Sequence, residues 1–217
     1  MFSDIKAAIF DLDGTLIDSM GLWNSIDVNY LKKFNLAVPE RLQDDICHLN
    51  FQETAAYFKD RFNIPDSLDK IMADWHNMAY DAYCTSIKLK KGVVEFLQFL
   101  KDSNIKIALA TSNSNDLLEA SLKANKIYDF FDAITTTSEV ERNKEFPDVY
   151  LLAAKKLSVA PENCLVFEDL PTAIKGAKKG NMKVTGVYDK WNEEDWPLIQ
   201  KIADYSIKDY NELLVNV

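Results

Sequence analysis

The chain has 217 residues, 47% of them hydrophobic, and carries a formal net charge of -9 at pH 7. This length suits one core domain with an insertion, and the apolar fraction is sufficient for a sizeable core. The negative charge argues against nucleic acid or an anionic membrane surface as a partner. No apolar run approaches the 18 residues that a membrane-spanning helix needs, so we expect no membrane association.

The chain contains three widely spaced cysteines, Cys47, Cys84 and Cys164, and no Cys-x-x-Cys pair. This pattern supports neither a disulfide framework nor a thiolate zinc site. Cys164 falls within an apolar strand pattern, which predicts a buried thiol. The N-terminus lacks a basic segment followed by an apolar one. We therefore expect a cytoplasmic protein. Separately, we expect a monomer or a weak dimer, although no sequence feature fixes the oligomeric state.

The first predicted element is a buried strand over residues 5–10, which are almost all apolar. Two carboxylates, Asp11 and Asp13, follow it directly. Gly14 then allows the backbone to turn, and Thr15 adds a hydroxyl group. Ligands of parallel α/β sheets bind outside the carboxyl ends of the strands, so this turn is a candidate site. The alternative is a plain Asp-Gly turn in which Asp13 only bonds to the backbone.

From Asp18 to about Tyr83 the apolar spacing is helical throughout, with Asp18 or Ser19 as the expected N-cap. Four successive helices are expected, at residues 23–34, 39–46, 51–62 and 68–83. Because no strand interrupts them, these helices predict a bundle-like module. Its two histidines, His48 and His76, are expected at the surface or in packing rather than at a metal site.

After Gly92 helices and strands alternate, which predicts a parallel sheet with right-handed crossovers. Helices are expected at 93–100, 117–122, 149–157 and 172–179 and around Glu212, and strands at 105–110, 132–136, 163–167, 182–188 and 204–207. We therefore predict the α/β class: a Rossmann-like parallel sheet flanked by helices, with an inserted all-helical domain. The core would comprise residues 1–17 and 88–217, and the insertion residues 18–87.

Polar groups also follow three later strands of the predicted sheet. In chain order they are Thr111, Ser112, Asn113, Lys144, Glu168 and Asp169. Singly, each has a structural explanation as a helix cap, a solvated charge or the acidic start of a helix. Together with the first turn, they could converge at one edge of the sheet. The six glycines form no Gly-x-Gly, which argues against a dinucleotide fingerprint or a Walker loop.

The order of the segments DLDGT, TSN, Lys144 and FED resembles the haloacid dehalogenase-like hydrolase superfamily. The helical insertion after the first segment resembles the subgroup of β-phosphoglucomutases and many small-molecule phosphatases. The resemblance covers nearly the whole chain and implies that the insertion is a cap domain. Three positions depart from the family pattern: Glu145 occupies the place of a proline after Lys144, and Leu170 and Ala173 those of a serine and a glycine. The last two are expected to alter local packing and to leave the carboxylates in place.

The resemblance implies a phosphatase that acts on a small phosphorylated metabolite through an aspartyl-phosphate. Asp11 would be the nucleophile, Asp13 the general acid and base, and Lys144 the cation that stabilises the transferred group. The implied Mg²⁺ ligands are Asp11, the Asp13 carbonyl, Asp169 and, nearby or through water, Glu168. The implied phosphate-binding residues are Thr111, Ser112, Asn113 and Lys144.

The sequence fits other activities less well than hydrolysis. A sugar phosphomutase of this family carries a cap arginine where Gln52 stands in this chain. A dehalogenase lacks an acid at the position of Asp13. Phosphonate cleavage needs a cap lysine that reaches the substrate, and nothing in the sequence singles out such a lysine. If the chain were a non-catalytic binding module on the same scaffold, some of the catalytic carboxylates should be replaced, yet all of them are present. Candidates for substrate selection are Trp23, Asn24, His48, Gln52 and Trp75, with helix packing as the alternative for the tryptophans.

Overall fold

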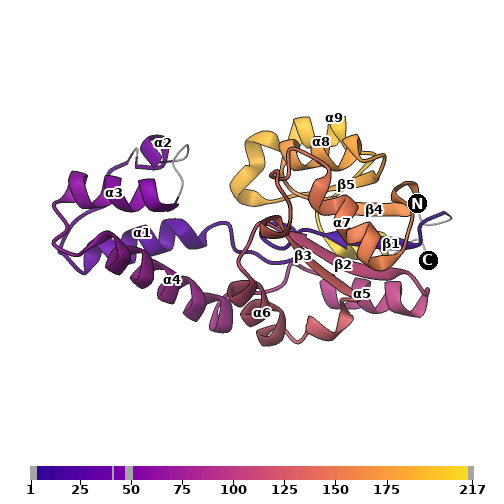
Figure 1. Cartoon of the computed structure of the whole chain (residues 1–217), viewed down its shortest axis with the longest axis horizontal. Helices are drawn as coiled ribbons and strands as arrows, with labels where there is room; N and C mark the ends of the chain where they lie inside the picture. Colours follow the sequence, from indigo (N-terminus) through magenta and orange to yellow (C-terminus); the bar gives the residue numbers. More distant parts are fainter. Residues whose placement is uncertain (1–3, 41, 47–50, 215–217) are drawn as a thin grey trace. The chain divides into compact units, whose positions relative to one another are not determined.

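A computed structural model of the chain describes residues 4–40, 42–46 and 51–214 (Figure 1). The chain divides into two compact units. One consists of Met1–Met20 together with Ile87–Val217, and the other of Gly21–Ser86. None of the helices in the described part of the chain combines the length and the apolar character that crossing a lipid bilayer requires.

The larger unit is built on a sheet of six parallel strands. They are β1 (Ala7–Phe10), β2 (Lys106–Thr111), β3 (Ala133–Thr136), β4 (Cys164–Glu168), β5 (Lys183–Val187) and β6 (Tyr205–Ile207). Their spatial order is β3-β2-β1-β4-β5-β6, and every neighbouring pair is parallel. This is the strand order of the Rossmann fold, so the predicted α/β class is confirmed.

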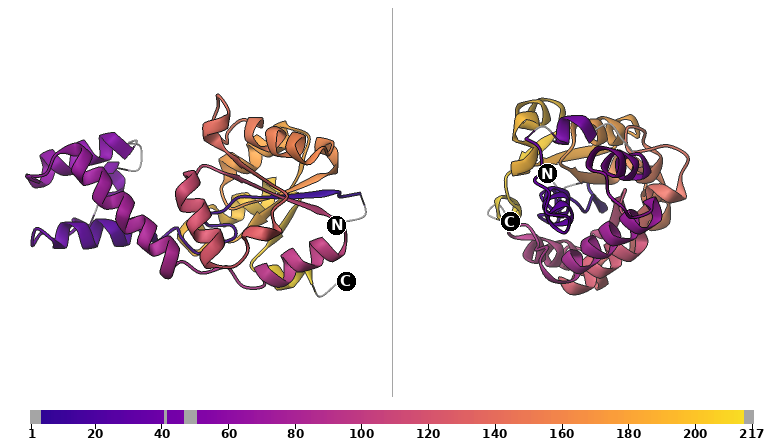
Figure 2. Two further views of the ribbon diagram at one scale, coloured as in Figure 1. Left: turned by 60° about the horizontal axis from the view of Figure 1, so that its bottom comes forward. Right: turned by 90° about the vertical axis from the view of Figure 1, so that its left-hand side faces the viewer.

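Helices cover both faces of this sheet (Figures 1 and 2). The α-helices are α5 (Val93–Asp102), α6 (Asn115–Ala124), α7 (Asp148–Leu157), α8 (Pro171–Lys179) and α9 (Trp196–Ile202). Short 3-10 helices are η1 (Tyr128–Phe130), η2 (Thr137–Glu139), η3 (Pro161–Asn163), η4 (Lys190–Asp195) and η5 (Tyr210–Leu213). Residues of α7, α8 and α9 share one apolar cluster with β1, β2, β4 and β5, whereas α5 and η5 contribute Phe96 and Tyr210 to a cluster with Phe10.

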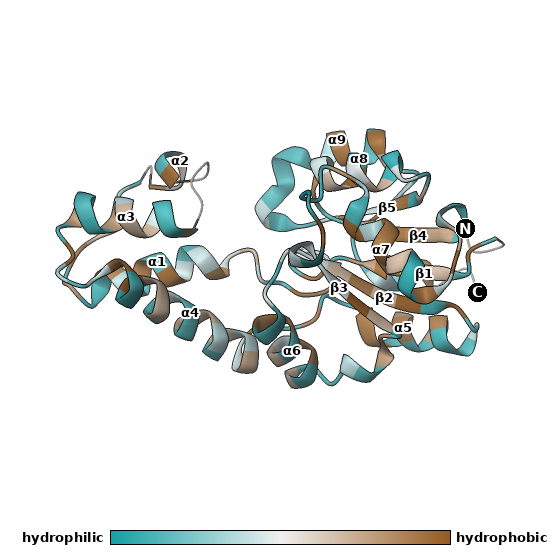
Figure 3. Cartoon of the chain, viewed as in Figure 1, coloured by the Kyte–Doolittle hydropathy of each residue, from teal (hydrophilic) through white to brown (hydrophobic). Residues whose placement is uncertain are grey.

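The central strand β1 is buried on both faces, because the helices of the two layers enclose it. Ile9 packs in the cluster of α7, whereas the Phe10 ring stacks on Phe167 with centroids 4.5 Å apart. Figure 3 shows the apolar residues concentrated in the strands of this unit. A strand enclosed in this way needs a continuous apolar run, which explains why residues 5–10 show no alternation. Cys164 in β4 is fully buried, as predicted.

The smaller unit is entirely helical in its described residues. Its helices are α1 (Leu22–Lys32), α2 (Leu42–Ile46), α3 (Phe51–Phe62) and α4 (Leu68–Thr85). Trp75 of α4 is 2% exposed and meets the rings of Tyr30 and Phe58 edge-on. Trp75 therefore packs in the core of this unit, whereas Trp23 is 42% exposed. Cys47 and His48 lie outside the described residues.

The structure corrects two local predictions and adds two elements. Helix α1 begins at Leu22 after Gly21, which makes no side-chain cap, so neither Asp18 nor Ser19 is its N-cap. A cap residue directly precedes the first helical residue, and Asp18 and Ser19 lie too early in the chain for that place; Asp18 pairs with Lys190 of η4 and Ser19 donates to Asp13. The predicted helix around Glu212 is the 3-10 helix η5. Helix α9 and η4 were not predicted at all.

Candidate active site

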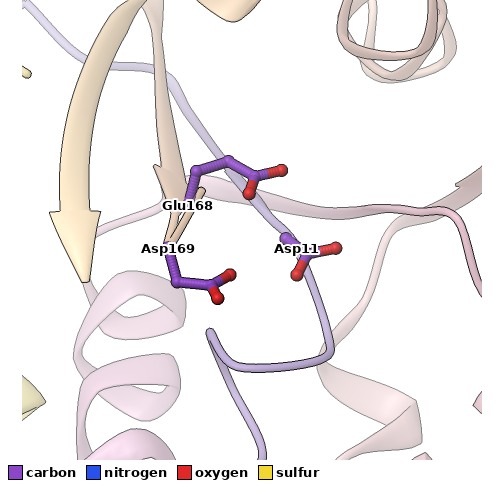
Figure 4. Close-up of side chains that lie close together, drawn as sticks. All are labelled: Asp11, Glu168 and Asp169. Atoms are coloured by element: carbon purple, nitrogen blue, oxygen red, sulfur yellow. The ribbon is translucent and has the colours of Figure 1, made fainter. Parts of the chain in front are cut away.

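Three carboxylates meet where β1 and β4 end: those of Asp11, Glu168 and Asp169 (Figure 4). Each offers an oxygen within 4.8 Å of the others, and all three residues are buried. β1 pairs with β2 on one side and β4 on the other, so the sheet changes its direction of winding between β1 and β4. In open α/β sheets, this is where ligands bind.

Lys144 supplies the positive charge of the cluster. Its Nζ contacts Asp11 Oδ1 and lies 2.6 Å from Glu168 Oε1. The hydroxyl of Tyr150, in α7, donates to the same oxygen of Glu168 at 2.7 Å. A cation from the loop before α7 and a hydroxyl from α7 thus converge on one carboxylate oxygen.

The backbone around Lys144 packs closely against α8. A Cβ added to Gly176 of α8 would lie 1.9 Å from the carbonyl oxygen of Lys144, so this position has no room for a side chain. Lys179 Nζ donates to the carbonyl of Glu145 at 2.8 Å, and the N–H of Glu145 donates to Asn143 Oδ1 at 3.1 Å. These contacts hold the loop in place without a proline at position 145.

Both oxygens of Asp169 accept hydrogen bonds from side chains. Thr15 Oγ1 donates to Oδ1 at 2.9 Å, and Asn192 Nδ2 donates to Oδ2 at 3.1 Å. Gly14 has a φ of +79°, and a Cβ there would lie 2.3 Å from Asp169 Oδ2. The Asp-Gly turn therefore needs glycine both for its conformation and for the close approach of this carboxylate.

Asp13 is held by one donor on each oxygen. Ser19 Oγ donates to its Oδ1 at 2.6 Å, and Asn113 Nδ2 donates to its Oδ2 at 2.8 Å. Thr111 is buried at the end of β2, where its Oγ1 accepts the N–H of Asn113 at 3.1 Å. The structure thus brings Asp13, Thr111 and Asn113 together, whereas Ser112 is exposed.

The charges in the cluster are out of balance. Burial raises the pKa of Asp169 well above its usual range, and the charges of Asp11 and Glu168 raise it further. Burial also raises the pKa of Glu168, although the Lys144 charge opposes this shift. Burial by itself lowers the pKa of Lys144, but the charges of Asp11 and Glu168 outweigh it and raise the pKa overall. Burial is thus the largest cause for both carboxyl groups, and nearby negative charge adds to it, whereas for Lys144 the nearby negative charges prevail over burial.

The donor set of this cluster fits a divalent cation. Glu168 Oε2 is buried and has no hydrogen-bond partner among the described residues. With all groups ionised, three carboxylates and one ammonium leave two negative charges, which a divalent cation would neutralise. The available donors are oxygen atoms, as Mg²⁺ prefers.

Four residues that support this site were not singled out from the sequence: Ser19, Tyr150, Gly176 and Asn192. For Ser19 the sequence predicts a helix cap instead. Tyr150 and Gly176 lie within predicted helices, where a tyrosine or a glycine has many structural explanations. Asn192 lies in a segment for which no element was predicted. The partners of Tyr150, Gly176 and Asn192 lie at least 18 residues away in the sequence, so no local pattern identifies these three.

The chain is similar to known proteins of one family. Residues 8–187 match the family described as "Haloacid dehalogenase-like hydrolase". The chain is 28% identical over 190 residues to "Phosphorylated carbohydrates phosphatase" of Thermotoga maritima, a match that covers 87% of this chain and 88% of the relative. It is 27% identical over 185 residues to "Hexitol phosphatase B" of Escherichia coli K12, with 82% of each chain covered.

A solved structure is also similar over its whole length. The protein described as "putative beta-phosphoglucomutase" from Thermotoga maritima superimposes with a TM-score of 0.87 at 27% identity, covering 98% of this chain and 100% of that one. The fold and the resemblance seen in the sequence are therefore confirmed. Because the family match spans most of its length, the chain belongs to the haloacid dehalogenase-like hydrolases.

Proposed function

We propose that this protein is a Mg²⁺-dependent phosphatase that hydrolyses a small phosphomonoester, with Asp11 as its nucleophile. The family and the names of its relatives support a hydrolase of phosphoric monoesters. The observation that carries the proposal is the buried cluster in which Asp11 contacts Lys144 beside Glu168 and Asp169. A complete set of charged groups of this kind argues against a non-catalytic binding module.

In the proposed reaction, a carboxylate oxygen of Asp11 attacks phosphorus and forms an aspartyl-phosphate while the bond to the ester oxygen breaks. Asp13 protonates that departing oxygen. Asp13 then takes a proton from the water that hydrolyses the intermediate, which restores both carboxyl groups to their starting forms. Lys144 stabilises the charge that spreads over the phosphoryl oxygens, and Thr111, Ser112 and Asn113 hydrogen-bond to them.

The metal would be held by Asp11 and Asp169 and by the main-chain carbonyl of Asp13, with Glu168 as a direct or water-mediated ligand. The unsatisfied Oε2 of Glu168 and the excess negative charge support this assignment. When bound, Mg²⁺ supplies the positive charge that lets an anionic ester approach the anionic carboxylate of Asp11.

For the substrate, we propose a phosphorylated sugar or sugar alcohol. The names "Phosphorylated carbohydrates phosphatase" and "Hexitol phosphatase B" support this class. We propose further that the inserted residues 18–87 act as the cap that selects it. The name of the solved Thermotoga maritima structure favours a phosphomutase as the second candidate, although Gln52 stands where the sugar phosphomutases carry an arginine.

The test is phosphate release from a panel of sugar and sugar-alcohol phosphates, with Mg²⁺ and with EDTA. We expect release only with Mg²⁺ and none above background from Asp11→Asn. The exposed Asp129→Asn variant is the matched control and should retain full activity. Full activity in Asp11→Asn would refute the nucleophile assignment. Isomerisation of β-glucose 1-phosphate faster than its hydrolysis would favour the phosphomutase.

A further inference from the structure

Asp169 is bound by a residue outside all the predicted site segments, Asn192 of η4. The Asn192 amide binds Oδ2 and the Thr15 hydroxyl binds Oδ1, so each oxygen of Asp169 has its own donor. The last torsion of an aspartate is broad and poorly restricted by itself. One donor on each oxygen therefore selects one orientation of the carboxylate plane.

A turn held by Asp189 places the Asn192 side chain. Asn192 has φ −115° and ψ 30°, which interrupts the helical geometry of η4. Its N–H donates to the carbonyl of Asp189 at 3.2 Å, and Asp189 Oδ1 accepts the N–H of Trp191 at 2.8 Å. Asp189 is 3% exposed, so the carboxylate that organises the turn is itself buried.

Lys90 connects the two donors that bind Asp169. Its Nζ lies 2.9 Å from Asp189 Oδ2 and donates to the carbonyl of Tyr188 at 2.6 Å. Its backbone N–H donates to the carbonyl of Leu16 at 2.8 Å, one residue after Thr15. Thr15 and Asn192 are therefore joined by a closed path of hydrogen bonds and short backbone segments that begins and ends at Asp169.

We propose that Asn192 is a positioning residue that orients Asp169 for the divalent cation, and that the Lys90–Asp189 pair holds Asn192 in place. This inference rests on the proposed function, because it assumes that Asp169 is a metal ligand. Partners that orient a ligand commonly change metal affinity by about 10–100-fold when they are removed. Asn192 would act only through Asp169.

The test is direct binding of Mn²⁺ to the whole protein, followed by electron paramagnetic resonance without substrate. Asn192→Leu has a similar shape but no donor, and we expect its Kd for Mn²⁺ to rise about 10-fold or more. Asp189→Asn keeps an acceptor for Trp191 but loses the charge that pairs with Lys90, and a smaller rise is expected. The matched control is Asn163→Ala, which removes a 2.9 Å bond to the carbonyl of Asp4, and its Kd should not change.

The melting temperature in EDTA shows whether each variant is folded before its Kd for Mn²⁺ is compared with that of wild type. A Kd for Asn192→Leu within twofold of wild type would overturn the inference, whether or not the melting temperature falls. If that variant does not fold, Asn192→Ser, whose shorter side chain also removes the amide, decides by the same criterion. Failure of the wild-type protein itself to bind Mn²⁺ would overturn the proposed function and this inference with it.

Discussion

Lys144 Nζ lies 2.6 Å from Glu168 Oε1, and both side chains are almost inaccessible, at 11% and 1% exposure. The same ammonium contacts Asp11, so one cation is the counter-charge of two buried carboxylates. A buried charge that loses its partner is costly, whereas an exposed pair contributes little. The consequences of removing Lys144 should therefore differ from those of removing a surface lysine.

Replacing Lys144 by methionine should affect both activity and stability. We expect kcat to fall by about 10²–10³, since a preorganised charge on the phosphoryl group is lost. Without metal, the free energy of unfolding should fall by about 3–5 kcal/mol, because Asp11 and Glu168 lose their counter-charge. Mg²⁺ should recover part of this loss. Phosphate release and urea unfolding measure the two effects.

The control is Lys178→Met, which removes the exposed 2.9 Å pair with Asp204. It should change the free energy of unfolding by no more than about 1 kcal/mol. Wild-type activity in Lys144→Met would contradict the role assigned to this lysine.

Asp13→Asn should separate the two halves of the reaction. An amide can neither protonate the leaving oxygen nor accept a proton from water, so turnover should slow by about 10²–10⁴. With a substrate whose leaving group needs no proton, the aspartyl-phosphate should accumulate, and rapid-quench labelling measures it. Ser19→Ala removes only the 2.6 Å donor to Asp13 and should have a much smaller effect. Hydrolysis of the intermediate at the wild-type rate would exclude Asp13 as the base.

Gly176→Ala tests the packing of the Lys144 loop. Helix propensity favours alanine over glycine by about 1 kcal/mol, so propensity predicts a more stable protein. The Cβ would meet the Lys144 carbonyl at 1.9 Å, so steric repulsion predicts a less stable and less active one. We expect the second outcome, measured by melting temperature and kcat. An exposed change in the same helix, Lys175→Ala, is the control, and a stabilised, active Gly176→Ala would contradict the packing argument.

Asp132 should make the stability of the folded protein depend on pH. Burial raises the pKa of this carboxyl group, but hydrogen bonds from Lys101 and from the N–H of Ile107 outweigh burial, and its pKa is lowered overall. A carboxyl whose pKa is lower in the folded state stabilises the fold above its unfolded pKa of about 3.9. This stabilisation is lost as the pH falls through the folded pKa.

The expected observation is a higher melting temperature for wild type than for Asp132→Asn at pH 7, with the gap closing as the pH falls below about 4. Lys101→Met should narrow the gap at pH 7, because it removes the ammonium that lies 2.8 Å from Asp132. If the difference in melting temperature between wild type and Asp132→Asn does not change with pH, the charge of Asp132 is not the source of the stabilisation.

Cys164 should resist alkylation in the native protein. Burial, with a smaller contribution from the Glu162 charge, raises the pKa of its thiol to about 11. The reactive thiolate is therefore scarce at pH 8, and the side chain is inaccessible. We expect iodoacetamide to label Cys164 only after denaturation, as read by peptide mass spectrometry. Labelling of the native and the denatured protein at equal rates would contradict this.

Much of this protein follows from short-range patterns in its sequence. The apolar run before Asp11, the Asp-Gly turn and the alternation of helices with strands after Gly92 are local features, each expressed within about ten residues. They predict that acids follow buried strands in a parallel sheet, and the structure places Asp11, Glu168 and Asp169 in that arrangement. The roles of these residues in catalysis and metal binding stay predictions.

The tertiary structure alone decided which distant groups meet. The strand order β3-β2-β1-β4-β5-β6 places the end of β1 beside that of β4, a consequence of pairing between segments more than 150 residues apart. Even at a separation of six residues, between Asp13 and Ser19, capping preference predicts a helix cap where the folded loop makes a 2.6 Å hydrogen bond. Tyr150, Gly176 and Asn192 likewise gain their contacts only through packing. Hydrogen bonding and steric exclusion depend on distance in space, which sequence periodicity does not encode.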